Sequence, residues 1–316
     1  MSFYIMEFMQ TLSAFYESVF GCKTYKISLD AGCTCPNRDG TKGSGGCIFC
    51  SENGSGDFAA ERNLSVREQL EQGRKLIEAK LRGRSGERSG KYIAYFQNFT
   101  STYGDAEALL KKYREALSCE NVAGLAVGTR PDCLNDEILA GLAEISQTHF
   151  VQIELGLQTS NEQTGHFINR CYTNNDYTDA VARIRKAAPS IHIVTHLIFG
   201  LPGETEADML NSVKFVVEHN ARLVSASPFG LKITVLYILK NTPLAQLYES
   251  GSYQPLTKEA YFALLEKALP LLPSNCVVHR LTGDPPKSLL IAPSWTTDKK
   301  RVLNDLLTLL KSHNKI

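Results

Sequence analysis

The chain has 316 residues, is 43% hydrophobic and carries a net charge of +1. It is long enough to bury a large core, and its near-neutral balance excludes a protein whose whole surface is basic. The sequence contains no uninterrupted apolar run of about 18 residues, the length needed to cross a membrane. Residues 1–20 lack the pattern of a signal peptide. We therefore expect a soluble, cytoplasmic protein.

Six short apolar or β-branched segments alternate with segments of helical periodicity. This succession predicts α/β architecture, a partial (β/α)6 TIM barrel, with a doubly wound open sheet as the alternative. The expected strands are 25–30, 92–96, 122–127, 150–156, 191–199 and 233–239. The expected helices are 64–82, 104–118, 135–147, 160–187, 205–220 and 241–249.

The pattern changes after the sixth strand. Residues 256–272 predict an amphipathic helix, 276–281 an edge strand and 299–311 a closing helix. We expect this part to be a C-terminal α/β extension packed on the barrel. The predicted division is an N-terminal segment 1–24, a barrel 25–250 and an extension 251–316.

Cysteines cluster in a glycine-rich loop after the first expected strand. Cys35, Cys47 and Cys50 have the spacing Cys-x11-Cys-x2-Cys. Thiolates bind iron–sulfur clusters and zinc, and adding Cys33 would give the four ligands of a structural zinc site. The loop by itself does not decide between an iron–sulfur cluster and a zinc ion. The odd total of nine cysteines favours a reducing compartment.

Polar residues follow several expected strands, at the end where a barrel gathers its active site. They include the segments 97–104 and 128–132, and the turn 200–204. Glu154 lies inside an apolar run, where a carboxylate needs a partner or a ligand.

A local basic segment accompanies these features. Between Arg67 and Lys91, eight Lys and Arg residues stand against four Glu residues. This excess is consistent with phosphate binding, and a solvated helix face followed by a loop explains it as well.

Together the motifs resemble the radical S-adenosylmethionine (SAM) superfamily, in the branch related to the radical domain of the Elongator catalytic subunit. Within it, the chain is most similar to proteins of the YhcC/YtqA type. The resemblance rests on Cys35-Pro36-Asn37-Arg38-Asp39-Gly40, Tyr95-Phe96-Gln97-Asn98-Phe99-Thr100, Thr129-Arg130-Pro131-Asp132, Glu154-Leu155-Gly156-Leu157-Gln158, Gly200-Leu201-Pro202-Gly203-Glu204 and His279-Arg280-Leu281-Thr282-Gly283-Asp284.

The resemblance implies a [4Fe-4S] cluster held by Cys35, Cys47 and Cys50, with SAM on the open iron and Cys33 outside the site. Cys22 and Cys171 stay unassigned. The resemblance also implies that Phe49 lies near adenine, Gln97 and Thr100 near the SAM amine, Glu154 near the ribose, Arg170 near the carboxylate, Gly200 to Glu204 near the adenine side, and Gln158 among the cofactor residues.

On the substrate side, the resemblance implies roles for Arg130, Tyr237, His279, Arg280 and Asp284. Relatives tend to carry Gly-His where Cys171-Tyr172 stand, and a histidine where Tyr237 stands. An ion pair of Arg280 with Asp284 around Gly283 is the structural alternative for these two residues.

The activity implied is trimming of a carboxymethylaminomethyl group to aminomethyl on a tRNA wobble uridine, with flavodoxin or ferredoxin as electron donor and without DNA or membrane partners. Two alternatives stay open: a radical SAM enzyme for a small metabolite or peptide, and a zinc-stapled binding module without enzymatic activity.

Overall fold

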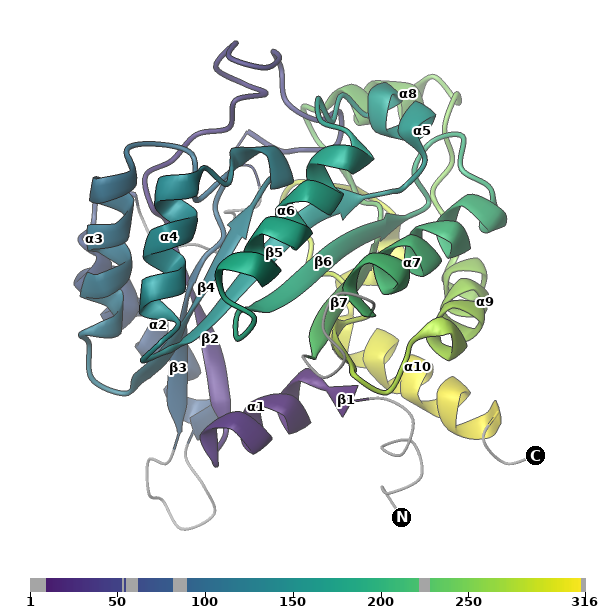
Figure 1. Ribbon diagram of the computed structural model, residues 1–316. Helices are drawn as coiled ribbons and strands as arrows, with labels where there is room; N and C mark the ends of the chain where they lie inside the picture. The colour runs from purple at the N-terminus through teal and green to yellow at the C-terminus, as the bar shows by residue number, and fades with distance from the viewer. Residues whose placement is uncertain (1–9, 53, 55–61, 82–89, 222–227, 314–316) are drawn as a thin grey trace.

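The computed structural model describes residues 10–52, 54, 62–81, 90–221 and 228–313 (Figure 1). Its centre is a curled parallel sheet of eight strands in the order β1-β9-β7-β6-β5-β4-β3-β2. From β2 to β7 each strand pairs with the next strand along the chain, which is the pattern of successive βα units. The expected partial barrel is thereby confirmed.

The sheet consists of β1 Gln10–Thr11, β2 Thr24–Leu29, β3 Lys91–Phe96, β4 Val122–Thr129, β5 Phe150–Gln158, β6 His192–Phe199, β7 Phe229–Val235 and β9 Cys276–Arg280. A small antiparallel sheet joins β8 Ile238–Leu239 to β10 Leu290–Ala292.

Helices cover the outer face of the sheet (Figure 1). They are α2 Val66–Leu81, α3 Ala106–Leu117, α4 Asp136–Ile145, α6 Asn174–Ala187, α7 Glu206–Ala221, α9 Lys258–Ala268 and α10 Lys299–His313. Two short helices, α5 Glu162–Phe167 and α8 Pro243–Glu249, lie at the upper end of the barrel, and α1 Leu12–Phe20 at the lower end. In the described part of the chain, no helix is both long enough and apolar enough to cross a membrane.

Side chains along each strand point alternately to the outer and the inner face of the sheet, which separates the apolar core from the site. In β5, Val151, Ile153 and Leu155 point outward into the main apolar core under the helices. Residues of the other parity, such as Gln152 and Glu154, point inward because successive side chains leave a strand on opposite faces. The inner face is therefore free to carry polar groups while the outer face supplies the packing that holds the sheet.

Helix α1 closes the lower end of the barrel. Phe15 and Tyr16 are buried against the inner face, and the Tyr16 hydroxyl donates to Gln152 Oε1 at 3.1 Å. The Phe15 ring stacks on His192 with 4.6 Å between centroids. Access to the barrel interior is consequently from the opposite end, where the strands finish and the cysteine loop lies.

Three predicted elements differ from the structure. The helix expected over 160–187 is interrupted between α5 and α6. The strand expected over 233–239 begins earlier, as β7, and its last part forms β8. The strand expected at the sheet edge, β9, pairs with β7 on one side and with β1 on the other, so that it lies inside the sheet.

The division of the chain at 24 and 250 stays a prediction. Strand β9 belongs to the expected extension and β1 to the expected N-terminal segment, yet both hydrogen-bond into the central sheet.

Candidate active site

The cysteine loop is folded tightly by its own backbone. The amides of Lys42 and Gly43 both donate to the Pro36 carbonyl, at 2.9 and 3.2 Å, and the Gly46 amide donates to the Asn37 carbonyl at 2.8 Å. At Gly46 the backbone has φ +78°, a conformation that favours glycine. These contacts return the chain so that Cys47 comes back beside Cys35.

Arg38 joins the two halves of the loop. Its Nη2 donates to the Ser51 carbonyl at 2.5 Å and its Nη1 to the Glu52 carbonyl at 3.1 Å. The guanidinium carbon lies 5.5 Å from the centroid of the Phe99 ring. A single side chain from the Cys35 end thus fixes the backbone that follows Cys50.

Residues 168–172 clamp the loop from outside. Asn169 Nδ2 donates to the carbonyls of Ser44 and Gly46 at 3.1 and 2.7 Å, and the Ile48 amide donates to the Ile168 carbonyl at 3.1 Å. The buried Asn37 side chain donates in turn to the Asn169 carbonyl. We call this clamp, together with residues 35–50, the cysteine cradle.

Arg170 anchors the clamp to strand β5. It is completely buried, and its donors reach the carbonyls of Leu157 at 2.9 Å, Thr159 at 2.6 Å and Tyr172 at 3.0 Å. The remaining Nη2 donates to Glu162 Oε2 at 2.9 Å. Protein groups therefore occupy the guanidinium, and this position does not support the expected contact with the SAM carboxylate.

Arg130 fixes the cradle from strand β4. Its Nε and Nη2 donate to the two carboxylate oxygens of Asp132, each at 2.9 Å, and Lys42 Nζ lies 2.6 Å from the same carboxylate. Its Nη1 points at Cys35 Sγ, 3.9 Å away. The expected substrate residue Arg130 is thus beside the cysteines, where a cation stabilises thiolates.

The three sulfurs face one cavity and influence one another. A hydrogen bond with Cys50, burial and the nearby thiols of Cys50 and Cys35 raise the pKa of Cys47. In the described ranges, no three His, Cys, Asp or Glu side chains are placed to hold a single metal ion. A cluster differs from a single ion in that each cysteine binds a separate iron, so that its ligands stand further apart.

Cys33 lies apart from this group. It packs in the core between sheet and helices, and burial raises the pKa of its thiol to about 11. It lines an outer cavity with Lys42 and Arg62, not the cavity of the three cysteines. The arrangement fits a three-cysteine cluster and does not fit the four-cysteine zinc site.

Two adjoining cavities, of about 280 and 270 Å³, form a chamber inside the barrel beneath the cradle. Most predicted site residues line it. The first cavity is lined by Cys35, Cys47, Cys50, Phe49, Gln97, Thr100, Arg130, Glu154 and Gln158. The second adds Tyr237, Arg280 and Asp284.

Gly200 and Glu204 do not line the chamber. The Gly200 carbonyl accepts from the Tyr253 hydroxyl at 2.6 Å. Glu204 accepts from the Thr159 hydroxyl, while its Oε2 is buried without a hydrogen-bond partner in the described structure. Burial raises the pKa of Glu204 to about 7, against the effect of the Thr159 hydrogen bond. Both residues brace the strand ends instead of contacting the cavity.

His279 also differs from its expected place. It is buried at the lower end of the barrel, with its Nε2 2.8 Å from His192 Nε2, and the two rings stack at 5.0 Å. Burial lowers the pKa of both imidazoles, that of His192 to about 3. His279 consequently packs the floor below the chamber and does not line either cavity.

The ion pair of Arg280 with Asp284, the structural alternative for these two residues, does not form. Asp284 pairs with Lys299 of α10 instead. Arg280 is exposed to the chamber, opposite Lys232 in the register of β9 with β7.

Sequence reasoning missed a group of charged residues around Glu154. Its carboxylate lies 2.5 Å from Lys26 Nζ and 2.8 Å from His196 Nε2, and it also accepts from Lys232 and the Tyr95 hydroxyl. These donors already occupy both oxygens, so that the expected ribose contact of Glu154 is not supported. A lysine inside the apolar strand Phe229–Val235 was the available signal.

The charges in this group shift one another's pKa values. Burial would raise the pKa of Glu154, but Lys232, Lys26 and His196 hold it well below its ordinary value. Burial lowers the pKa of Lys232 to about 7; the attraction of Glu154 opposes that shift, while repulsion from Lys26 and Arg280 adds to it. Burial, with Lys232, lowers the pKa of His196 to about 4, so this ring is neutral near pH 7. We call Lys26, Glu154, His196, Lys232 and Arg280 the cationic cluster.

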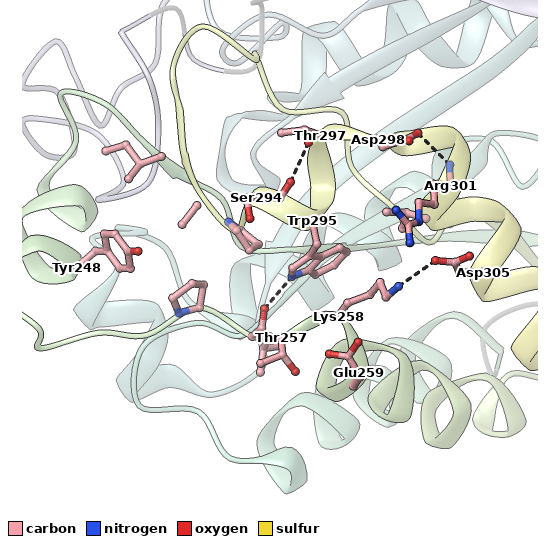
Figure 2. A pocket seen from close by; sticks show the side chains of 16 residues that line it. Tyr248, Thr257, Lys258, Glu259, Ser294, Trp295, Thr297, Asp298, Arg301 and Asp305 are labelled. Carbon is pink, nitrogen blue, oxygen red and sulfur yellow. Dashed lines mark hydrogen bonds and ion pairs between the residues drawn. The ribbon is translucent and has the colours of Figure 1, made fainter.

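A further cavity, of about 690 Å³, lies outside the barrel among the C-terminal elements (Figure 2). Lys258 reaches across it to Asp305 at 2.9 Å, and Trp295 Nε1 donates to the Leu256 carbonyl at 3.1 Å. Its described lining includes none of the predicted site residues. Size alone therefore does not identify the site; the chamber beneath the cysteines does.

Comparison with known proteins gives matches over nearly the whole chain. Residues 38–216 match the family model for the radical SAM superfamily, and residues 228–312 match that for the radical SAM C-terminal domain. The chain is 39% identical to the uncharacterized protein YtqA of Bacillus subtilis over 293 residues, 93% of this chain and 86% of that protein. It is 35% identical to protein YhcC of Escherichia coli over 300 residues, 93% of this chain and 89% of that protein.

More distant matches concern parts of larger proteins. A tRNA-2-methylthio-N(6)-dimethylallyladenosine synthase of Cutibacterium acnes is 27% identical over 169 residues, 52% of this chain and 32% of that protein. The structure of archaeal Elp3 from Methanocaldococcus infernus superimposes with a TM-score of 0.63 at 14% identity, over 90% of this chain and 63% of that one. At that identity the likeness shows a shared fold.

Proposed function

This chain belongs to the radical SAM superfamily, whose members use a [4Fe-4S] cluster and SAM, and on that premise we propose that it modifies the side chain of a tRNA wobble uridine. The observation that carries the proposal is the chamber inside the barrel directly beneath the three cysteines, whose lower end α1 covers. A radical needs such a chamber, because walls that exclude water prevent side reactions.

In this proposal, Cys35, Cys47 and Cys50 hold the cluster. When bound, the reduced cluster and SAM supply a 5′-deoxyadenosyl radical that removes a hydrogen atom from the substrate. Arg130 beside Cys35 balances the charge of the thiolates, and the clamp anchored by Arg170 keeps the loop closed around them.

The cofactor residues we assign are those that line the first cavity. Phe49 offers an aromatic face for adenine, and Gln97, Thr100 and Gln158 offer polar groups at the ends of β3 and β5. Glu154 acts through its neighbours, because protein donors occupy its carboxylate. Gly200, Glu204 and Arg170 support the strand ends.

The proposed substrate carries a carboxymethylaminomethyl group and the product an aminomethyl group. Loss of a hydrogen atom from the carbon between nitrogen and carboxylate, followed by transfer of one electron to a one-electron acceptor such as the oxidised cluster, would leave an imine. Water hydrolyses that imine to the amine and a two-carbon oxo acid. The 5′-deoxyadenosyl group of SAM would leave methionine and take up the hydrogen atom as 5′-deoxyadenosine, and a one-electron carrier such as flavodoxin or ferredoxin would reduce the cluster.

Support for tRNA comes from the tRNA-modifying synthase that shares part of this chain's sequence, and from the shared fold with Elp3. These are analogies of family and fold. The basic segment between Arg67 and Lys91 is described only in part, since residues 82–89 lie outside the described ranges. A cytoplasmic location, also proposed, is consistent with nine free cysteines.

The test is an anaerobic reaction of the reconstituted protein with SAM, dithionite and tRNA that carries the carboxymethylaminomethyl group. Nucleoside mass spectrometry should show aminomethyluridine together with 5′-deoxyadenosine. Deoxyadenosine released with an unchanged tRNA would reject the wobble-uridine assignment and leave a small metabolite or peptide as the substrate class. Changing Arg82, Arg84 and Arg88 to Ala should reduce turnover only when the substrate is a polynucleotide.

A further inference from the structure

The cationic cluster contains more positive charge than its own packing requires. Lys26, Lys232 and Arg280 stand against the single carboxylate of Glu154, and burial keeps His196 neutral. One counter-ion is enough to keep a buried carboxylate ionised. Lys26 and Lys232 both pair with Glu154, so that one of these two charges is additional.

Among the described residues, the carboxylates close to the chamber other than Glu154 are paired with other cations. Within the described ranges Arg280 makes no ion pair, because Asp284 is held by Lys299. Asp132, the other carboxylate close to the chamber, is held by Arg130 and Lys42. The described residues of the chamber therefore leave excess positive charge at Lys232, which is buried, and at Arg280, which is exposed.

The surplus charges are aligned and face the cavity. His196, Lys232 and Arg280 occupy one level across β6, β7 and β9, as the strand register shows. Lys232 and His196 line both cavities, and Arg280 lines the second. The three cysteines border the first cavity, so a molecule in the chamber can lie between them and the two cations.

We propose that Lys232 and Arg280 form an anion-binding subsite, which holds the carboxylate of the substrate side chain while its adjacent carbon faces the radical source. The inference rests on the proposed function and adds to it the group of the substrate that the chamber recognises. It also gives Glu154 a role as a positioning residue, because its carboxylate fixes the Lys232 ammonium in place.

The charge state of Lys232 agrees with this geometry. Burial lowers its pKa to about 7, with Lys26 and Arg280 repelling its proton. An anion bound next to Lys232 would raise that pKa, so that binding near pH 7 to 8 takes up a proton. Calorimetry in two buffers of different ionisation enthalpy measures this uptake directly.

The test compares uridine ligands on the reconstituted holoenzyme with SAM and without reductant. The probes are 5-carboxymethylaminomethyluridine, 5-aminomethyluridine, and uridine 5′-monophosphate as the alternative source of an anion. We expect the acid nucleoside to bind at least about tenfold more tightly than the amine, since a charged hydrogen bond contributes about that factor or more.

Two variants probe the subsite and a third is the control. Lys232→Met removes one cation and leaves Glu154 paired with Lys26, and Arg280→Gln changes an exposed side chain. Lys267→Gln removes a cation of the outer helices that pairs with Glu206. Each subsite variant should weaken binding of the acid nucleoside about tenfold to a hundredfold and leave the amine unchanged, whereas the control should change neither.

Equal binding of acid and amine by the wild-type protein, or wild-type affinity in Arg280→Gln, would overturn the subsite. If the two subsite variants lost affinity only for uridine 5′-monophosphate, the subsite would bind phosphate, and the carboxylate assignment would be rejected. Failure of the proposed reaction would look different. The acid nucleoside would still bind in a way that depends on Lys232 and Arg280, while the tRNA would stay unchanged in the turnover assay. That outcome would keep the subsite and reject the reaction.

Discussion

The cysteine cradle and the cationic cluster border the same chamber, but they are held by different kinds of contact. In the cradle, side chains such as Arg38, Asn169 and Arg170 donate to backbone carbonyls, so that the loop keeps its shape through neutral acceptors. In the cationic cluster, ionised side chains from separate strands hold one another around Glu154. The backbone contacts of the cradle should therefore depend little on pH, whereas the ion pairs of the cationic cluster should depend on it.

Removing the anchor of the cradle should have the largest effect on stability. Arg170→Met leaves the buried carbonyls of Leu157 and Thr159 without donors, and we expect a loss of about 3 to 5 kcal/mol in the free energy of unfolding. Urea denaturation followed by circular dichroism measures it. Arg183→Met, which breaks a half-exposed ion pair with Asp136, is the matched control and should cost less than about 1 kcal/mol. Equal losses in the two variants would contradict the role of Arg170.

Removing the central carboxylate of the cationic cluster should come next. Glu154→Gln leaves Lys26 and Lys232 buried without a counter-ion, at a cost of about 3 kcal/mol at pH 7. In the folded wild-type protein the pKa values of both lysines are already lowered, and loss of the carboxylate lowers them further. In the unfolded chain the lysines keep their protons up to about pH 10. Stability should accordingly rise with pH, and the loss should be smaller at pH 9 than at pH 7.

Urea denaturation at the two pH values tests this sign. The exposed Glu144→Gln, which loses only a surface pair with Arg114, is the control. A loss from Glu154→Gln that grew with pH would show that the lysines are not the source of the cost.

A smaller effect is expected at Glu204, which does not line the chamber. Burial raises its pKa to about 7, above the ordinary value, so the folded protein binds more protons than the unfolded chain between about pH 4 and pH 7. The stability of the wild-type protein should fall as pH rises through that window. Glu204→Gln keeps the acceptor for Thr159 and should be more stable than wild type at pH 8 by about 1 to 2 kcal/mol.

Thermal unfolding of both proteins at pH 5 and pH 8 measures the difference. The exposed Glu206→Gln provides the control, since it loses only a surface pair with Lys267. Parallel pH profiles for wild type and Glu204→Gln would remove Glu204 as a source of pH dependence.

The sequence was informative where function depends on local spacing. The interval between Cys35, Cys47 and Cys50 is short enough that a loop must bring the sulfurs together, and the structure places all three on one cavity. Gln97 and Gln158 follow the predicted strands 92–96 and 150–156, and strand ends converge in a barrel. Those features could be predicted because one short segment, or one rule of topology, determines them.

The sequence was less informative where function depends on register between distant strands. Lys26 and Lys232 come from β2 and β7 and meet only because both point inward toward Glu154 from β5. The surroundings of Arg170 could not be predicted for a different reason: the helical pattern of 160–187 hides a break at Asn169 and Cys171, which adopt positive φ without being glycine. Tertiary contacts of the clamp with the cysteine loop hold that conformation.

The central claim is that three cysteines, and not Cys33, hold a cluster above the chamber. Iron, sulfide and zinc content of protein purified and reconstituted without oxygen tests it most directly, in wild type, Cys33→Ala and Cys47→Ala. We predict about four irons and four sulfides per chain in wild type and in Cys33→Ala, with loss of the cluster in Cys47→Ala. One tightly bound zinc per chain that disappears in Cys33→Ala would contradict the account.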